Sequence, residues 1–465
     1  MEIRQKIKED SAFQYVVQSL DIISSVGKRQ LMGQPFLTEA SSLEQEWSRI
    51  EKMCKLLQDS RYTVVLNELR HQLMQLHDIR STLIALSTHQ VLSEVELFEV
   101  KLMSQLCQII RGDLLQLGFS DEIAIPDTVA VFALLDPDDT HIANFYIYDS
   151  YHCDLGPLRR EIRELQSIDH LTVAQQEELN TMLERHDALQ QEVITQLSDQ
   201  LVPYAAILSE ALEAAGYCDM ILAKSQQALD WGLTRPHTGK SLALHGLFHP
   251  QLKRHHEEHG RRYQPVDLQM NEGVCLITGA NMAGKTVLLK SVACCQLMAQ
   301  FGMFVPAEQA VLPLADDAVS CIGDEQDEMQ GLSSYAAEIL RISRNLQRSR
   351  KERLLLLIDE PARTTNPVEG QALVTAIAAL LNRQQGFALV TTHYSDIGVA
   401  CQRMRVRGFD EHLATTPINA ESINQFIDYS LVEEHGNEVP HEAIRIAELL
   451  GCDSEMLQTA KAALK

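Results

Sequence analysis

The segment that most constrains this 465-residue chain runs from Gly279 to Thr286 and fits the pattern GxxxxGK[ST]. It follows the apolar run Val274–Thr278 and precedes the helix-favouring run Val287–Lys290. In that setting, glycines let backbone N–H groups approach phosphates, and the start of a helix favours negative charge. The pattern therefore predicts a phosphate-binding loop, although so short a pattern also occurs by chance. The loop residues are Gly279, Ala280, Asn281, Met282, Ala283, Gly284, Lys285 and Thr286.

Such a loop binds ATP with Mg²⁺, with Lys285 reaching the β- and γ-phosphates and Thr286 ligating the metal. The second half of the site is an apolar strand that ends in an acid, and Leu354–Ile358 followed by Asp359 and Glu360 fits it. We expect Asp359 to hold Mg²⁺ through water and Glu360 to polarise the attacking water. The alternative is a buried strand that happens to end in an acidic helix cap.

A third apolar run, Phe387–Thr392, predicts another strand and ends at His393. This position suits a side chain that senses the γ-phosphate, although a lone histidine after a strand is more often structural. From Gly273 onward, apolar runs alternate with helical stretches, which is typical of a parallel sheet in an α/β domain.

The first half of the chain differs from the second in pattern. Residues 1 to about 231 are poor in Gly and Pro and carry apolar residues at three- and four-residue spacings, which predicts helices. Residues 159–216 predict one or two long, partly exposed helices. Between these regions, Thr128–Leu135 and Asn144–Tyr148 predict two short strands joined by a polar turn.

Charge and cysteine content limit the classes of protein to which this chain can belong. Lys+Arg 40 against Asp+Glu 64 give a formal net charge of -24, which weighs against a surface built mainly to hold nucleic-acid phosphates. The 10 cysteines include no CxxC pair, and no apolar stretch is long enough for a membrane span. We expect a reduced, cytoplasmic protein with no membrane association.

The segments around these motifs resemble the MutS family of ATPases. The matching segments are residues 278–286, 296–307, 323–338, 358–370 and 391–397, with weaker similarity at 20–29, 147–155, 249–250 and 440–451. The resemblance implies a helical core and lever followed by an α/β P-loop ATPase domain with C-terminal dimerisation helices. The implied boundaries are 1–155 for the helical core with its β interruption, 156–235 for the lever helices, 236–430 for the ATPase domain and 431–465 for the dimerisation segment.

The resemblance also implies roles for single residues. Two ATPase domains pair, as a homodimer or with a related ATPase subunit, so that Ser333 of one completes the nucleotide site of the other. Gln300 corresponds to a coupling glutamine and is grouped with the nucleotide-binding residues, and Tyr263 is a candidate to stack on adenine. The alternatives are a packed surface aromatic for Tyr263 and a helix N-cap for Ser333.

The chain departs from the family pattern in ways that bear on whether it acts on DNA or on a protein. We find no counterpart to the family's mismatch-reading domain, clamp segment or nuclease domain. The runs Asp359–Pro367 and Phe132–Pro137 resemble a subgroup of short, acidic MutS-like proteins, similar to the ATPase subunit of the lysine 5,6-aminomutase reactivase. That similarity implies remodelling of a protein client such as an adenosylcobalamin-dependent aminomutase. The alternative is a DNA-binding role in mismatch repair or recombination.

The run from His255 to His259 matches HxxEH, a pattern found in zinc peptidases. It lies in a strongly charged stretch, Lys253–Arg262, and no partner motif for a zinc hydrolase accompanies it. The pattern favours a solvated helix or loop, and a metal site is the alternative.

Overall fold

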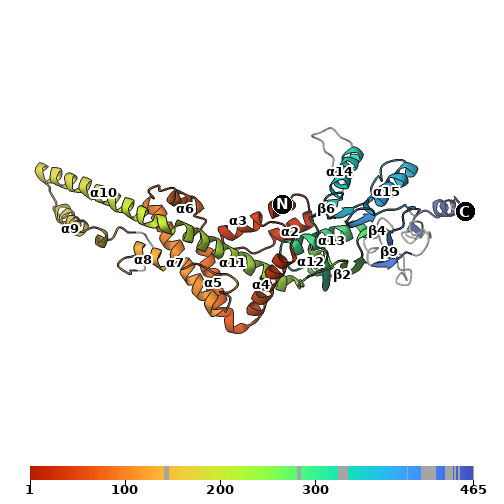
Figure 1. Cartoon of the computed structure of the whole chain (residues 1–465), viewed down its shortest axis with the longest axis horizontal. Helices are drawn as coiled ribbons and strands as arrows, with labels where there is room; N and C mark the ends of the chain where they lie inside the picture. The colour runs from red at the N-terminus through yellow and green to blue at the C-terminus, as the bar shows by residue number, and fades with distance from the viewer. Residues whose placement is uncertain are drawn as a thin grey trace. The chain divides into compact units, whose positions relative to one another are not determined.

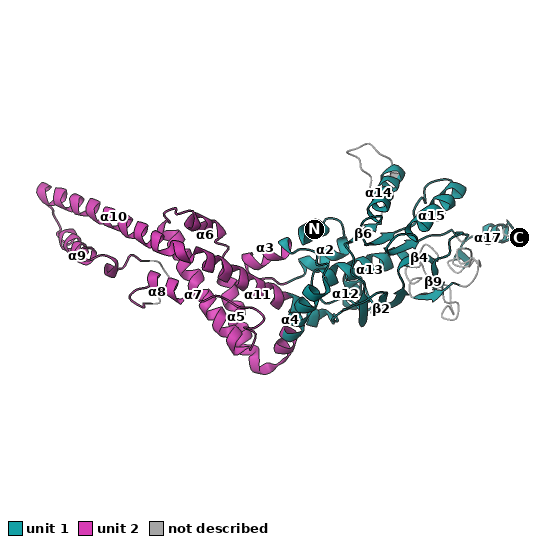
Figure 2. Ribbon diagram, in the orientation of Figure 1, with its two compact units in different colours: residues 1–20, 33–52, 224–465 teal, residues 21–32, 53–223 magenta. Residues whose placement is uncertain are grey.

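The computed structural model describes residues 1–140, 146–279, 284–322, 334–394, 396–409, 426–434, 444, 447–448 and 451–463 (Figure 1). The chain forms two compact units (Figure 2). Unit 1 comprises residues 1–20, 33–52 and 224–465, and unit 2 comprises residues 21–32 and 53–223. The chain therefore passes between the units four times. Within the described part of the chain, no helix combines the length and apolar character that crossing a membrane requires.

Unit 2 is helical in its described residues, as the spacing of apolar residues predicts. The longest helix, α10 (Val173–Leu201), begins with a reciprocal cap between Thr172 and Gln175. An apolar cluster of Leu158, Ile162 and Leu179 packs α9 against α10. The other helices with residues in this unit are α3 (Ser25–Gly33), α4 (Ala40–Gln58), η1 (Ser60–Tyr62), α5 (Thr63–Gln75), α6 (Arg80–Ser87), α7 (Glu94–Gln116), α8 (Val129–Leu135), η2 (Asp149–Tyr151), α9 (Leu155–Gln166), η3 (Val202–Tyr204) and α11 (Ala205–Trp231).

The strand predicted over residues 128–135 is wrong, because this segment forms helix α8. Both ends of α8 are tied to α7. Thr128 Oγ1 donates to the carbonyl oxygen of Ser104 at 2.7 Å, and Asp136 pairs with the buried Lys101 at 3.3 Å. The partners on α7, Lys101 and Ser104, are three residues apart, so the two ends of α8 must lie close to each other. A seven-residue helix is only about 10 Å long, whereas a seven-residue strand would extend about 23 Å, so the helix fits these contacts better. Residues 146–148 of the second predicted strand are not in a strand, and residues 144–145 lie outside the described residues.

Unit 1 contains a six-stranded sheet with the order β10-β9-β4-β8-β7-β6. β10 is antiparallel to β9, and the other neighbouring pairs are parallel. The predicted strands over 274–278, 354–358 and 387–391 are confirmed as β4, β7 and β8. The strands are β4 (Gly273–Thr278), β6 (Asp317–Cys321), β7 (Leu354–Ile358), β8 (Gly386–Thr391), β9 (Gln402–Phe409) and β10 (Ile427–Glu433).

Helices follow the parallel strands, as expected for an α/β domain. α13 (Lys285–Gln300), α14 (Ser334–Arg348) and α15 (Pro367–Leu381) come after β4, β6 and β7 respectively. Buried residues of β4, β7 and β8 form one apolar cluster with Val374 and Ile377 of α15. Because these strands are buried and parallel, their carboxyl ends meet at one edge of the sheet.

A second sheet in unit 1 has the order β1-β5-β2-β3. Its strands are β1 (His237–Thr238), β2 (Leu242–Leu247), β3 (Val266–Met270) and β5 (Gln309–Leu312), with α12 (Pro250–Glu258) between β2 and β3. The chain's described C-terminal helix is α17 (Ser454–Ala463). Since β10 extends to Glu433, the predicted C-terminal helical segment, residues 431–465, begins within a strand.

Residues 1–20 belong to unit 1, although the sequence predicts one continuous helical domain over residues 1–155. This segment includes α1 (Ile3–Lys6) and α2 (Ser11–Gln18). The buried Lys6 ammonium pairs with Asp317 of β6 at 2.7 Å, and the ring of Phe13 stacks on Phe301 with centroids 5.3 Å apart. These long-range contacts attach the first helices to the α/β sheet. The functional boundaries at 155 and 235 stay a prediction.

Candidate nucleotide-binding site

The predicted phosphate loop joins the buried strand β4 to helix α13. Gly279 and Gly284 bound it with φ values of 143° and 72°, in the region that favours glycine. A Cβ at Gly284 would also lie 2.9 Å from the ring of Tyr429 on β10. Gly284 is the N-cap of α13, so the N–H groups of the first helical turn follow the loop directly. Residues 280–283, to which we assigned phosphate binding, lie outside the described residues.

Lys285, the first residue of α13, has a buried ammonium that contacts oxygen atoms of Gly279 and Glu360. It donates to the carbonyl oxygen of Gly279 at 2.5 Å and pairs with Glu360 Oε1 at 2.9 Å. The side chains of Lys285 and Glu360 are 3% and 12% exposed, so the pair is largely withdrawn from water. The structure thus brings the predicted phosphate-binding lysine and the predicted catalytic carboxylate into contact.

Asp359 follows β7 and connects two other elements through its two carboxylate oxygens. Oδ2 accepts a hydrogen bond from Thr286 Oγ1 at 2.6 Å, and Oδ1 accepts one from Thr391 Oγ1 at 2.6 Å. Thr286 lies in the first turn of α13, and Thr391 is the last residue of β8. A threonine hydroxyl beside a carboxylate is a set of hard oxygen donors, which fits Mg²⁺. These contacts support the prediction that Thr286 and Asp359 hold the metal.

Thr391 is a site residue to which the sequence analysis assigned no role. Its buried hydroxyl donates to Asp359 and accepts a hydrogen bond from the backbone N–H of Glu360 at 2.9 Å. One side chain therefore orients both acidic positions. The sequence feature that could have identified Thr391 is a hydroxyl at the last position of an apolar strand, because neighbouring parallel strands end at the same edge of the sheet.

The backbone after Glu360 takes an uncommon conformation. Glu360 and Ala362 have φ values of 41° and 62°, which residues with a Cβ rarely adopt. The N–H of Ala362 donates to Glu338 Oε1 on α14 at 3.2 Å, which helps to hold this turn. Strained residues of this kind cluster at functional sites. Ser333, which we expect to complete a partner's site, lies outside the described residues, just before α14.

Tyr263 is partly buried, and its hydroxyl accepts a hydrogen bond from the backbone N–H of His249 at 2.8 Å. Burial raises the pKa of Tyr263 and lowers that of His249 to about 4. The next residue, Gln264, hydrogen-bonds to Asp428 and to the backbone N–H of Tyr429 on β10. Since Tyr429 borders Gly284, these bonds connect the Tyr263 segment to the phosphate loop. Adenine stacking by Tyr263 stays a prediction.

Gln300 does not lie at the phosphates, which corrects its assignment as a nucleotide-binding residue. It is the last residue of α13, and the helix rise places it about 22 Å from Lys285. Its buried amide donates to the carbonyl oxygens of Leu37 and Ala315, both at 2.8 Å. These bonds anchor the far end of the helix that carries Lys285. A coupling role through the helix stays a prediction.

His393 follows β8 at the same sheet edge as Asp359. Its ring packs against that of Tyr394, with centroids 4.1 Å apart. Within the described part of the chain, His393 has no hydrogen bond or ion pair to Asp359 or Glu360. The prediction that His393 senses a γ-phosphate is therefore supported by position alone.

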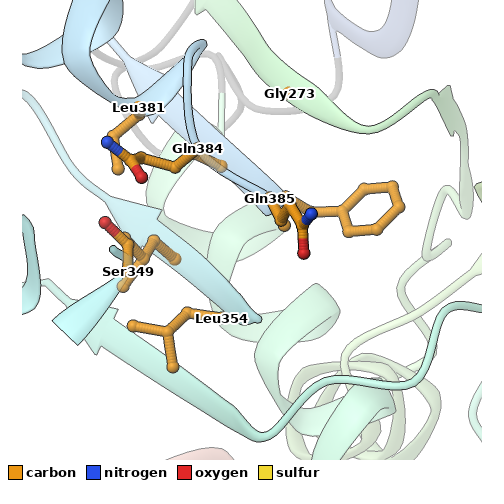
Figure 3. Close-up of a pocket in the computed structure, with 10 residues that line it drawn as sticks. Gly273, Ser349, Leu354, Leu381, Gln384 and Gln385 are labelled. Atoms are coloured by element: carbon orange, nitrogen blue, oxygen red, sulfur yellow. The ribbon is translucent and has the colours of Figure 1, made fainter. Parts of the chain in front are cut away.

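A pocket in unit 1 is not part of this site (Figure 3). It lies where β4, β7 and β8 begin, whereas Gly279 and Asp359 follow the carboxyl ends of their strands. Ligands of parallel α/β sheets bind outside the carboxyl ends. The residues lining the pocket include Gly273, Ser349, Leu354, Gln384, Gln385 and Gly386.

The parallel sheet, the glycines that bound the loop before α13 and the contacts of Lys285, Asp359 and Glu360 fit a P-loop nucleotide-binding domain. The family model for MutS domain V matches residues 275–465. Through residues 275–465 the chain belongs to the MutS family, in which domain V is the ATPase domain.

Two curated relatives, from two strains of Thermus thermophilus, illustrate the similarity. The DNA mismatch repair protein MutS of one strain is 31% identical over 310 residues, which cover 66% of this chain and 36% of the relative. The Endonuclease MutS2 of the other strain is 35% identical over 210 residues, which cover 45% of this chain and 27% of the relative. The chain therefore matches about a third of these relatives' length.

The Thr391 hydroxyl provides a test of the site. Thr391→Val removes the hydroxyl and leaves the Asp359 carboxylate and the Glu360 N–H short of a buried partner, at about 1–3 kcal/mol for each group. We expect kcat for ATP hydrolysis to fall about tenfold or more, and the Mg²⁺ concentration for half-maximal turnover to rise. Steady-state ATPase assays over a range of Mg²⁺ concentrations measure both.

Thr391→Ser is the matched control, because it keeps the hydroxyl. Its turnover is expected to stay within about threefold of wild type. Equal turnover and Mg²⁺ dependence in the two variants, at equal melting temperatures, would contradict the role assigned to Thr391.

Proposed function

We propose that this chain is a Mg²⁺-dependent ATPase whose nucleotide site lies at the carboxyl ends of β4, β7 and β8. The observation that carries the proposal is the bridge from Asp359 to Thr286 and Thr391, beside the Lys285–Glu360 pair. These contacts bring the predicted phosphate, metal and water-activating groups to one edge of the sheet. Bound Mg²⁺ would neutralise charge on the β- and γ-phosphates.

The proposed cycle begins with phosphate binding at the start of α13. The γ-phosphate offers the Lys285 ammonium a second anionic partner, so its contact with Glu360 is released. The freed Glu360 carboxylate then accepts a proton from the attacking water. Its position is set by the Thr391 hydroxyl, which binds its backbone N–H, and by the turn held at Ala362. His393 senses the γ-phosphate, and Tyr263 stacks on adenine.

We propose further that the active form is a dimer, either a homodimer or a pair with a related ATPase subunit. In this arrangement Ser333 of one chain faces the γ-phosphate held by its partner. Closing and opening of the paired ATPase domains then moves the helical unit 2, to which the chain of unit 1 connects four times. Hydrolysis resets the cycle.

The proposed target of that motion is a protein client of the cobalamin-dependent aminomutase class, as in a reactivase. The net charge of -24 supports a protein client, because DNA binding draws its affinity from clustered Lys and Arg. The similarity to a subgroup of acidic MutS-like proteins gives the client class. The second candidate is DNA, favoured by the relatives' names, which are mismatch repair protein and endonuclease.

Two substitutions test the ATPase. Lys285→Ala removes the ammonium that reaches the phosphates, so we expect nucleotide affinity to fall about tenfold or more. Glu360→Gln keeps the shape but not the base, so we expect ATP binding near the wild-type level, turnover reduced about a hundredfold and a trapped dimer. Fluorescent-nucleotide binding, ATPase assays and light scattering measure the three properties. Undiminished turnover in Glu360→Gln would remove this residue as the base.

The choice between a protein client and DNA is tested by measuring ATP turnover with matched, mismatched and branched DNA duplexes over a range of salt concentrations. A protein-remodelling ATPase is expected to show unchanged turnover with each duplex and no binding that falls steeply with salt. Lys285→Ala provides the background rate. Strong stimulation together with salt-sensitive binding would overturn the protein-client proposal in favour of a DNA-binding role.

A further inference from the structure

A cluster of potential metal ligands lies at the C-terminal end of α12. His255, Glu258 and His259 are exposed, and one ligand atom from each lies within 4.8 Å of the other two. His255 and His259 are four residues apart, so both project from one side of the helix. Their rings have centroids 4.3 Å apart. None of these side chains contributes to the site proposed for ATP.

A hydrogen bond fixes the orientation of one imidazole. His259 Nδ1 lies 2.7 Å from the backbone carbonyl oxygen of His255. A carbonyl oxygen can only accept, so Nδ1 carries the proton and Nε2 of the neutral ring keeps its lone pair. A backbone carbonyl bound to the distal ring nitrogen is the arrangement that orients histidine ligands in metal sites.

A weak ion pair with Arg254 competes with a metal for the third ligand, Glu258. Arg254 Nη2 lies 3.9 Å from Glu258 Oε1, and the two side chains are 46% and 62% exposed. An exposed pair at that distance contributes little, so a cation at Glu258 displaces it at small cost. All three ligands are exposed, and a tetrahedral ion would draw their atoms from within 4.8 Å to a separation of about 3.5 Å.

A second cluster provides a contrast. His152, Cys153 and Asp154 are adjacent in sequence and also offer three ligand atoms. There, however, His152 Nδ1 accepts the N–H of Asp154 at 3.2 Å, and the Asp154 carboxylate pairs with Arg185 at 3.0 Å. Two of the three ligands are therefore engaged in contacts that a metal would have to replace.

We propose that His255, Glu258 and His259 form a binding site for a borderline transition-metal ion, Zn²⁺ in particular. Two imidazoles and one carboxylate suit Zn²⁺ and do not suit Mg²⁺ or Ca²⁺, which take oxygen ligands. Water completes the coordination, because three ligands from one helical turn leave the other side of the ion open to solvent. The bound ion joins His255 and Glu258, which lie in the last turn of α12, to His259, which follows the helix. Tyr263 comes four residues later in the chain.

The test is Zn²⁺ titration of the full-length chain without an affinity tag, in competition with a chromophoric chelator. We expect one Zn²⁺ per chain at this site, with affinity lowered about tenfold or more by His255→Ala or His259→Ala. Replacement of the ion by Co²⁺ gives an independent readout, because the visible spectrum of Co²⁺ reports nitrogen ligation. Circular dichroism is expected to show unchanged folding, since the substituted residues are exposed.

His256→Ala is the matched control. His256 neighbours the cluster in sequence, but its Nδ1 lies 3.1 Å from the Arg262 carbonyl oxygen, and its ring packs on Tyr263. Zn²⁺ affinity is expected to stay within about twofold of wild type in His256→Ala. The same is expected in Lys285→Ala, which would show that Zn²⁺ binding at this cluster does not depend on the ATP site. Equal Zn²⁺ affinity in wild type and in the double variant His255→Ala, His259→Ala would overturn the proposal.

Discussion

The hydrogen bonds of the Asp359 carboxylate are the interaction on which the nucleotide site depends. They join the end of β7 to the first turn of α13 and to the last residue of β8. The register of the parallel strands places these groups together, because Ile358 of β7 lies beside Val390 of β8. Thr391 then binds the Glu360 N–H, so one network positions both the carboxylate proposed to bind metal and the carboxylate proposed to activate water. The ATPase proposal follows from this arrangement.

The opposite end of α13 is fixed by a different set of buried contacts. Lys224 donates to Gln34 Oε1 at 2.8 Å and to the carbonyl oxygen of Phe301 at 2.9 Å, and Gln300 binds Leu37 and Ala315. Burial lowers the pKa of Lys224 to about 8. A cation at a helix C-terminus satisfies carbonyls that lack helical partners. The helix that follows the predicted phosphate loop is therefore held at both ends.

The sequence predicted the parts of this structure that local pattern determines. The apolar runs before Gly279, Asp359 and His393 are β4, β7 and β8, and the GKT motif opens a helix as expected. The segment 128–135 was mispredicted because a short apolar run fits a strand or a helix, and its contacts with Lys101 and Ser104 decide between them. Thr391, Glu338 and Lys224 act through partners distant in sequence, so their contacts depend on the folded register. The resemblance gave the identity of Gln300 as a coupling glutamine but not its position, about 22 Å along α13 from Lys285.

The most direct test is whether Asp359 couples Mg²⁺ to ATP binding. Calorimetric titration with a hydrolysis-resistant ATP analogue, in Mg²⁺ and in EDTA, measures this coupling in wild type and in Asp359→Asn. The account predicts that Mg²⁺ tightens binding about tenfold or more in wild type and has almost no effect in Asp359→Asn. An Asp359→Asn protein that keeps the full Mg²⁺ dependence would show that this carboxylate does not organise the site.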